Sequence, residues 1–259
     1  MIRKPAVAGG FYPSDKKELE KMVTGFIADA PDAKIKNLRG IIAPHAGYIY
    51  SGPVAGHAYR QFQGLPAKKY NVFLLGPAHF IYTTASIGLF DEFETPLGPV
   101  KVNMEICHEL SKNTIFDPST EAHLPEHSLE VQLPFLQESM KEFEIIPILL
   151  GEASPQTISE ILLPYFGKDG NIFVFSSDLS HYLPYEKANK TDGHSLKVIT
   201  NGLLENENEI DACGNIGIRV AMRLAAENNC HIRLLNHGNS GDTAGDKNAV
   251  VGYASLAIY

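Results

Sequence analysis

GIIAPHAGY, at residues 40–48, passes from a short apolar run into a tight turn that presents a histidine. The same order recurs in LLGPAH at residues 74–79 and in FSSDLSHY at residues 175–182. Short apolar runs of this kind are typical of strands that are buried on both faces of a parallel sheet. Because ligand sites in such sheets form beyond the carboxyl ends of the strands, the three turns are expected to meet at one crevice.

The polar side chains of these turns are His45, His79, Asp178 and His181. A single histidine at the end of a strand is more often a hydrogen-bonded structural residue than a ligand. Three histidines in the same local context favour a shared site instead. Neutral imidazoles bind iron, zinc and copper well, but a metal site of this kind needs a third ligand.

Stiff turns surround the first two histidines. Pro44 and Pro77 restrict the backbone beside them, and Gly47 and Gly76 are expected to permit turns that other residues cannot make. A stiff backbone around an imidazole suits a preformed metal ligand.

Several residues are candidates for the third ligand, namely Asp178, Glu126, Glu130 and Cys213. Cys213 precedes a helix expected over residues 214–228. The start of a helix favours negative charge, which would bias this thiol toward the thiolate. The alternative is a small core residue, because free cysteine is among the most buried residue types. For Cys213 both interpretations stay open, whereas Cys107 and Cys230 fit the core interpretation.

PEHSLEVQLPF, at residues 125–135, opens another predicted helix. Ser128 is a candidate N-cap, and Glu130 would then compensate the helix dipole from the first turn. His127, exposed at the mouth of this helix, is expected to be a further polar group of the crevice. By contrast, the glycine-rich residues 238–246 lack the lysine of a phosphate-binding loop and favour a plain turn over a crevice wall.

Helical and strand patterns alternate along the chain. Ser14 is the expected N-cap of a helix whose apolar face spans residues 19–27, and Pro53 is the expected first residue of the next helix. Further helices are expected near residues 105–113, 128–141, 155–166, 185–204 and 214–228. Strands are expected at residues 38–43, 72–75, 145–150, 172–175, 232–235 and 249–258, with a hairpin at 84–104 that turns near Asp91 and at 97–99. This order predicts a single α/β domain over residues 1–259, with a largely parallel central sheet flanked by helices.

Composition excludes several classes of protein. The 259 residues carry 22 basic and 30 acidic side chains, a net charge of −8, so nucleic-acid and membrane binding are not expected. No apolar run is long enough to cross a bilayer, and the N-terminus lacks the apolar stretch of a signal peptide. Three cysteines without close spacing indicate reduced thiols, which predicts a cytoplasmic protein.

Five motifs in one order carry a resemblance to a known family. They are AGGFYP (8–13), APHAGY with YSG (43–48 and 50–52), LGPAH (75–79), EHSLE with LPF (126–130 and 133–135) and SDLSHY (177–182). Together they resemble the Memo family, whose microbial members are labelled AmmeMemoRadiSam system protein B. The match extends from residue 3 to the last strand.

The resemblance implies a fold similar to that of class III extradiol ring-cleavage dioxygenases, which are non-haem Fe(II) enzymes. It implies His45, His79 and Cys213 as metal ligands, His181 in the place of an acid/base histidine, and Asp178 beside it. The dioxygenases complete their iron site with a carboxylate, whereas a thiol stands third here. A thiolate is softer and shifts the preference toward zinc, copper(I) or electron-rich iron. Dioxygenase activity therefore does not follow from the fold.

Three functions compete at this stage. The first is a metal-binding protein, with Fe(II) ahead of copper or zinc, that has a redox or oxygenase-like activity in which His181 moves a proton and Asp178 orients it. The second is a non-catalytic binding or scaffold protein, with Tyr48 and neighbouring tyrosines at the crevice mouth contacting a small molecule, peptide or partner. The third is a zinc hydrolase with His181 or Glu130 as the base. The family label implies radical-SAM and Ammecr-type partners.

Overall fold

A computed structural model describes residues 1–243 and 246–259 and contains one large sheet among them. Its strands are β2 (Gly40–Ala43), β3 (Lys69–Pro77), β4 (Ala85–Ile87), β7 (Phe116–Asp117), β8 (Glu142–Leu150), β9 (Asn171–Ser176), β10 (His181–Leu183), β11 (Ile232–Asn239) and β12 (Val250–Ile258). They lie in the order β10-β12-β2-β9-β3-β8-β4-β7, and β11 pairs antiparallel with residues 252–258 of β12.

The centre of this sheet is parallel and its flanks are antiparallel. Strands β2, β9, β3 and β8 run in the same direction. On one side β12 pairs antiparallel with β2, and on the other β4 pairs antiparallel with β8. The α/β class is confirmed, and the sheet is mixed because β12 and β4 join the parallel centre in the antiparallel direction, while β7 pairs parallel with β4 at the edge.

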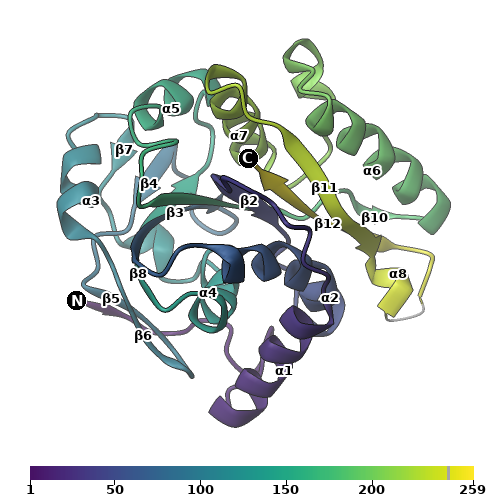
Figure 1. The fold of residues 1–259 in the computed structure, drawn as a ribbon, viewed down its shortest axis with the longest axis horizontal. Helices are drawn as coiled ribbons and strands as arrows, with labels where there is room; N and C mark the ends of the chain where they lie inside the picture. The colour runs from purple at the N-terminus through teal and green to yellow at the C-terminus, as the bar shows by residue number, and fades with distance from the viewer. Residues whose placement is uncertain (244–245) are drawn as a thin grey trace.

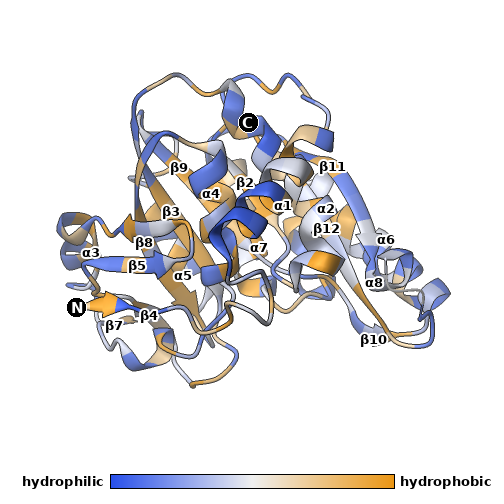
Figure 2. Cartoon of the chain, turned by 90° about the horizontal axis from the view of Figure 1, so that it is seen from below, coloured by the Kyte–Doolittle hydropathy of each residue, from blue (hydrophilic) through white to orange (hydrophobic). Residues whose placement is uncertain are grey.

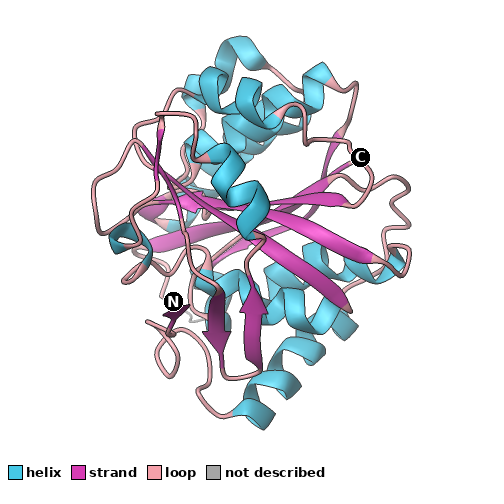
Figure 3. Ribbon diagram, turned by 90° about the vertical axis from the view of Figure 1, so that its left-hand side faces the viewer, coloured by secondary structure: helices cyan, strands magenta, loops and turns pink. Residues whose placement is uncertain are grey.

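Helices cover both faces of the sheet (Figures 1 and 3). They are α1 (Lys16–Asp29), α2 (Tyr48–Tyr59), α3 (Met104–Leu110), α4 (Leu133–Ser139), α5 (Pro155–Leu162), α6 (Tyr185–Thr200), α7 (Asn215–Glu227) and α8 (Ser240–Thr243). Helices α1, α2 and α4 pack on one another on one face, while α7 packs on β3 and β9 on the other, beside α5. None of these helices has the length and apolar character to span a membrane.

Several boundaries differ from the sequence-based expectation. The side chain of Asp15, not Ser14, caps α1 by accepting from the backbone N–H of Glu18. Pro53 lies inside α2 rather than at its start, where the carbonyl that loses its donor belongs to the exposed residue Ile49 and can turn to water. The helix expected over 128–141 is a short 3₁₀ turn followed by α4.

The expected hairpin is also divided between two sheets. Strands β5 (Glu92–Thr95) and β6 (Gly98–Lys101) form a hairpin at the predicted second turn, and β1 (Ile2–Arg3) adds to it as a third strand. The residues before Asp91 instead form β4 of the large sheet, so there is no hairpin turn near Asp91. All three residues of β4 are buried in the large sheet, whereas β5 buries alternate residues in the small one.

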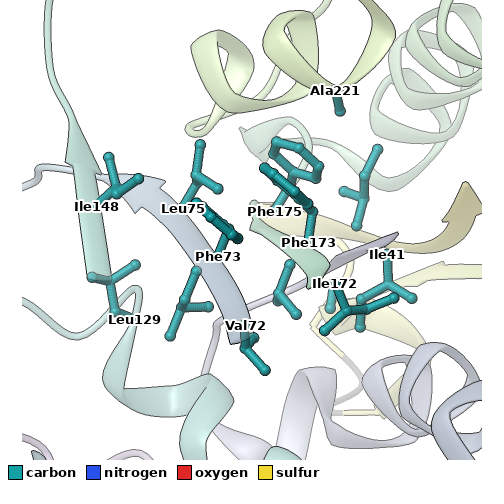
Figure 4. Packing of buried hydrophobic residues seen from close by; sticks show 14 of the residues in the cluster. Ile41, Val72, Phe73, Leu75, Leu129, Ile148, Ile172, Phe173, Phe175 and Ala221 are labelled. Carbon is teal, nitrogen blue, oxygen red and sulfur yellow. The ribbon is translucent and has the colours of Figure 1, made fainter. Parts of the chain in front are cut away.

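The core lies on both faces of the central parallel strands (Figures 2 and 4). Phe73 of β3 and Phe173 of β9 stack with ring centroids 4.5 Å apart and planes 5° apart, and Phe175 continues the row at 6.0 Å. All three side chains are buried. Burial of one such side chain contributes roughly 1.5–3 kcal/mol, so this row holds β3 and β9 side by side up to the edge where the turns begin.

A fully buried ion pair joins the N-terminal segment to the loop before α4. Glu130 accepts from the guanidinium of Arg3, from the hydroxyl of Tyr12 at 2.5 Å, and from the backbone N–H groups of Ala6 and Val7 at 2.8 and 3.1 Å. Both charged side chains are completely inaccessible. The expected dipole-compensating role of Glu130 is therefore wrong, because tertiary partners satisfy the carboxylate instead.

Arg3 extends the same network to the backbone of residues 123–126. Its guanidinium donates to the carbonyl oxygens of His123 at 3.1 Å and Glu126 at 2.6 Å. The pair thus fixes two segments that are far apart in sequence, and one of them carries Glu126 and His127 to the carboxyl edge of the sheet.

Glu130→Gln should destabilise the protein by about 3–5 kcal/mol, because the substitution leaves the guanidinium of Arg3 buried without a compensating charge. Denaturant unfolding measures the change. The matched control is Glu94→Gln, which breaks the exposed pair with Lys4 and should cost no more than ~1 kcal/mol. Equal losses in the two variants would contradict the structural role of the buried pair.

A second buried group, His123, makes stability depend on pH. Burial, and then the charge of Arg3, lower the pKa of His123 to about 3. The unfolded chain takes up a proton near the usual histidine pKa of about 6.5, while the folded chain resists it until about 3. Folding is therefore opposed increasingly as the pH falls through this window and is unaffected by His123 above it.

Accordingly, the unfolding free energy of the wild type should fall between pH 6 and pH 4 more steeply than that of His123→Leu, by up to ~1.4 kcal/mol per pH unit. Chemical denaturation at several pH values gives both slopes. His231→Leu, which removes an exposed histidine, should retain the wild-type slope. Identical slopes for the wild type and His123→Leu would show that the folded state admits the proton.

Candidate metal centre

The carboxyl ends of three neighbouring parallel strands meet at one edge of the sheet. In the order β2-β9-β3, these strands lead directly into the three turns that the sequence singles out. A pocket with a volume of about 740 Å³ lies there. The described residues that line it include His45, His79, His127, Asp178, His181 and Cys213.

Three side chains in this pocket are placed to share one ion. The ligand atoms of His45, His79 and Cys213 all lie within 4.8 Å of one another. The sulfur of Cys213 is 3.3 Å from Nε2 of His45, and the two imidazole rings meet edge to face with centroids 5.3 Å apart. Two imidazoles and a thiolate form a donor set that suits iron, zinc or copper.

Glu126 fixes both the backbone and the ring of His79. One carboxylate oxygen accepts from the backbone N–H of His79 at 2.6 Å, and the other lies 3.0 Å from its Nδ1. The second oxygen also accepts from the backbone N–H groups of His127 and Ser128, both at 2.9 Å. Burial alone would raise the pKa of Glu126, but these hydrogen bonds lower it to about 2.

Because Glu126 is ionised, Nδ1 of His79 carries the hydrogen, and the lone pair of its Nε2 is left for a metal. The oxygens of Glu126 are occupied by these donors, although Glu126 lies close enough to His79 and His127 to form a second candidate group. Glu126 was one candidate for the third ligand, and the structure gives it this supporting position instead.

His45 is buried, with 1% of its surface exposed. Burial lowers its pKa well below the usual value, and the nearby His127 and His79 lower it further. Nδ1 of His45 lies 2.8 Å from the hydroxyl of Ser176, at the end of β9. A neutral imidazole with one nitrogen bonded to the protein is the form in which histidine binds a metal.

Asp178 supports the turn of His45 rather than the ring of His181. Its Oδ1 accepts from the backbone N–H of His45 at 2.8 Å, and burial raises its pKa to about 7 against the opposing hydrogen bonds from His45 and Ala46. Nδ1 of His181 bonds instead to the carbonyl of Leu179 at 2.8 Å. Since a carbonyl only accepts, Nδ1 of His181 is the donor, and Nε2 is the remaining nitrogen.

Cys213 differs from the expected activated thiol. Burial, and then the charge of Asp178, raise the pKa of Cys213 to about 12. Cys213 lies before Gly214, the N-cap of α7, and its sulfur accepts from the backbone N–H of Asp178 at 3.3 Å. The helix start therefore does not outweigh desolvation in the metal-free chain. A coordinated cation reverses this balance, because a metal-bound thiol is deprotonated.

Aromatic side chains form part of the wall, but Tyr48 is not among them. Tyr48 is buried, and its hydroxyl donates to the carbonyl of Val131 at 2.7 Å. Tyr50, Tyr182 and Tyr253 line the pocket instead. Tyr182 has a φ of +57°, a strained value for a residue other than glycine, and its side chain is exposed.

His127 stands between the proposed ligands and the rim. Its ring stacks on His79 with centroids 4.8 Å apart and meets His45 edge to face at 5.4 Å. Phe11, which also lines the pocket, lies 4.8 Å from His127 on the N-terminal segment. Phe11 was overlooked as a site residue. The AGGFYP motif that contains it was the available signal.

Neither glycine of the first two turns is required by an unusual backbone angle, and only Gly76 is required by close approach. Gly47 has a φ of −54°, which any residue adopts. A Cβ atom on Gly76 would lie 2.7 Å from the hydroxyl oxygen of Ser128. That hydroxyl donates to the carbonyl of Pro77 at 2.8 Å. Glycine at position 76 thus lets the Ser128 segment reach the end of β3.

The glycine-rich loop contributes to the pocket, contrary to the expected plain turn. Residues 238–243 complete β11 and form α8, and both Ser240 and Asp246 line the pocket. Ala244 and Gly245, which belong to the same predicted loop, lie outside the described residues.

Glu126→Gln should destabilise the metal-free protein by about 1–3 kcal/mol, because an amide group would face donors that now meet a carboxylate oxygen. Unfolding in the presence of a chelator measures this cost. Glu121→Gln, at an exposed position in the preceding turn, is the control and should change stability by less than ~0.5 kcal/mol. A neutral Glu126→Gln would mean that the carboxylate does not hold the His79 turn.

Comparison with known proteins agrees with this architecture. Residues 3–257 match the Memo-like protein family. A protein named MEMO1 family protein from Sulfurisphaera tokodaii is 37% identical to this chain, with 99% of each chain covered. Proteins of the same name from Sulfolobus acidocaldarius and Aquifex aeolicus are 38% and 37% identical, with 99% and 98% of each chain covered. The chain therefore belongs to the Memo-like family.

Proposed function

We propose that this chain binds one divalent transition metal through His45, His79 and Cys213 and uses the adjoining pocket for a redox or oxygenase-like reaction. The observation that carries the proposal is the mutual distance of at most 4.8 Å between the three ligand atoms. The metal proposed is iron(II), with copper and zinc as the alternatives that the sulfur ligand also suits. A redox-active ion would supply electrons to a bound molecule or to O₂.

The chain's own groups bind and orient the reacting molecule and move its proton. Nε2 of His181 is free to accept a proton from a pocket-bound hydroxyl or amine, because Nδ1 already donates to the carbonyl of Leu179. The carbonyl keeps the ring in place through this exchange. Asp178 lines the pocket and fixes the backbone of His45.

The wall favours a small molecule with an apolar ring. Phe11, Tyr50, Tyr182 and Tyr253 contribute aromatic surface, and the lining residues that the structure describes contain no lysine or arginine. Aromatic rings gain from offset or edge-to-face contact with a ring of the ligand. A large anionic ligand finds no cationic side chain in this set to balance its charge.

Protein purified without oxygen and loaded with iron(II) should retain about one metal ion per chain, as expected for a single set of three ligands. His45→Ala/His79→Ala should lose this metal, because only the sulfur of the ligand set remains. Elemental analysis after removal of free metal gives the stoichiometry. Loading with zinc or copper in parallel shows which ion the site retains.

His194→Ala is the control, since it removes an exposed histidine that bonds to Glu209 away from the pocket. It should retain the metal of the wild type. Unchanged metal content in the double variant would overturn the proposed ligand set, and zinc retained in preference to iron would favour the hydrolase alternative over redox chemistry.

A binding function without catalysis is supported by a separate observation. Large apolar side chains are exposed after each of the first two histidine turns, with 65% of Ile49, 59% of Phe80 and 77% of Tyr82 accessible. Phe80 also contacts His127, a residue of the pocket wall. If this surface binds a partner or peptide, removal of the metal should leave the affinity unchanged.

For the hydrolase alternative, His181 is the remaining base. Glu130 is unsuitable, because it is inaccessible and its oxygens are occupied by Arg3, Tyr12 and the backbone. The radical-SAM and Ammecr-type partners implied by the family label stay predictions.

A further inference from the structure

Four buried groups meet behind the ring of His45. The hydroxyl oxygen of Ser176 lies 2.8 Å from Nδ1 of His45, 2.7 Å from the side-chain amide of Gln132 and 2.6 Å from the carbonyl oxygen of Ser128. The same amide lies 3.0 Å from the carbonyl oxygen of Pro44. The side chains of this group are almost completely inaccessible, so water does not alter their hydrogen bonds.

The carbonyl of Pro44 fixes which end of Gln132 faces inward. A carbonyl oxygen can only accept, so the group beside it must be the NH₂ and not the amide oxygen. The opposite end of Gln132 agrees with this orientation, because its oxygen accepts from the hydroxyl of Tyr59 at 2.6 Å. The second hydrogen of the NH₂ is therefore donated to Ser176.

The carbonyl of Ser128 then fixes the single hydroxyl hydrogen of Ser176. This carbonyl also only accepts, and at 2.6 Å it is the shortest contact of the hydroxyl. With its hydrogen directed at Ser128, the hydroxyl has two lone pairs left. Gln132 donates to one of them, so Nδ1 of His45 must donate to the other.

We propose that Ser176, held by Gln132, is a positioning residue that selects the Nδ1–H tautomer of His45 and leaves the Nε2 lone pair facing Cys213. The use of this tautomer rests on the proposed metal function, since a ligand nitrogen must be unprotonated. The tautomer itself is a property of the metal-free chain. It also makes the thiol of Cys213 the donor in the 3.3 Å contact with Nε2.

The opposite tautomer would disturb two buried contacts. A lone pair on Nδ1 could be satisfied only if the hydroxyl of Ser176 turned toward it, which would leave the carbonyl of Ser128 without this donor. The cost of one unsatisfied buried group predicts a ratio of at least about fivefold in favour of Nδ1–H. The hydroxyl of residue 176, rather than the imidazole itself, sets this preference.

Nitrogen-15 NMR of the metal-free protein distinguishes protonated from unprotonated ring nitrogens and tests the tautomer directly. In the wild type, Nδ1 of His45 should be protonated and Nε2 should not. Ser176→Ala should shift the population toward Nε2–H, because the acceptor for Nδ1 is lost. Ser176→Thr retains a hydroxyl and should restore the wild-type spectrum.

Ser139→Ala is the matched control. Ser139 is also a buried serine, but its hydroxyl donates to the backbone of α4 and does not contact the histidine site. It should leave the His45 signals unchanged. A wild-type His45 that is protonated at Nε2 would overturn the proposal, and so would a Ser176→Ala protein in which Nδ1–H stays dominant.

Titration with zinc alone adds a second measurement. Loss of the supporting hydroxyl should weaken zinc binding by about 10–100-fold in Ser176→Ala relative to the wild type, with Ser176→Thr near the wild type. If the wild type binds no metal, the proposed function fails, while the NMR result still decides the role of Ser176. If zinc affinity is equal in all variants, Ser176 does not prepare His45 as a ligand.

Discussion

Two buried carboxylates, four residues apart on one segment, hold the carboxyl edge of the sheet together. A buried charge is costly unless it is paired and hydrogen-bonded. Both carboxylates accept hydrogen bonds from donors in distant parts of the chain. Glu130 bonds to Arg3 of the N-terminal segment, while Glu126 bonds to both the backbone and the ring of His79. The segment between them carries His127 into the pocket. Its position is therefore determined from both sides.

The three histidines of the strand-end turns share one arrangement despite their different neighbours. In each, Nδ1 bonds to the protein: His45 to a hydroxyl, His79 to a carboxylate and His181 to a backbone carbonyl. Nε2 is thus the nitrogen that each ring leaves for the pocket, and that of His45 contacts the sulfur of Cys213 at 3.3 Å. The bonded partner still matters. An ionised carboxylate bonds to His79, whereas a neutral carbonyl bonds to His181. Carboxylate partners are typical of histidines that bind metals.

The sequence predicts those parts of the site that depend on local pattern. Apolar runs that end in histidine turns place His45, His79 and His181 after the carboxyl ends of β2, β3 and β9, because neighbouring parallel strands end at one edge. The direction in which Tyr48 points could not be predicted. It lies at the first residue of α2, one position from a pocket residue, and its burial depends on the segment that carries Val131.

Glu130 and Cys213 show why local rules fail at such a site. A glutamate near a helix start is ordinarily a solvated group that favours the dipole, and a cysteine near a helix start is ordinarily biased toward thiolate. Both expectations assume an exposed position. Here desolvation outweighs the dipole, so Glu130 needs the distant Arg3, and Cys213 keeps its proton in the metal-free chain. The spacing of residues in the sequence does not show whether a residue is buried, and burial determines both outcomes.

The buried groups that support the pocket and the exposed side chains at its rim differ in how freely they can be substituted. Ser176, Gln132 and Asp178 are buried groups that support the turn and ring of His45, and their hydrogen bonds leave little freedom for substitution. The rim includes exposed side chains such as Tyr182, which form few such bonds. A change at the rim can alter which molecule binds at little cost to folding. A change among the buried supporting groups acts on the proposed ligand set and on stability together. Within this architecture, specificity can therefore vary while the proposed metal site stays fixed.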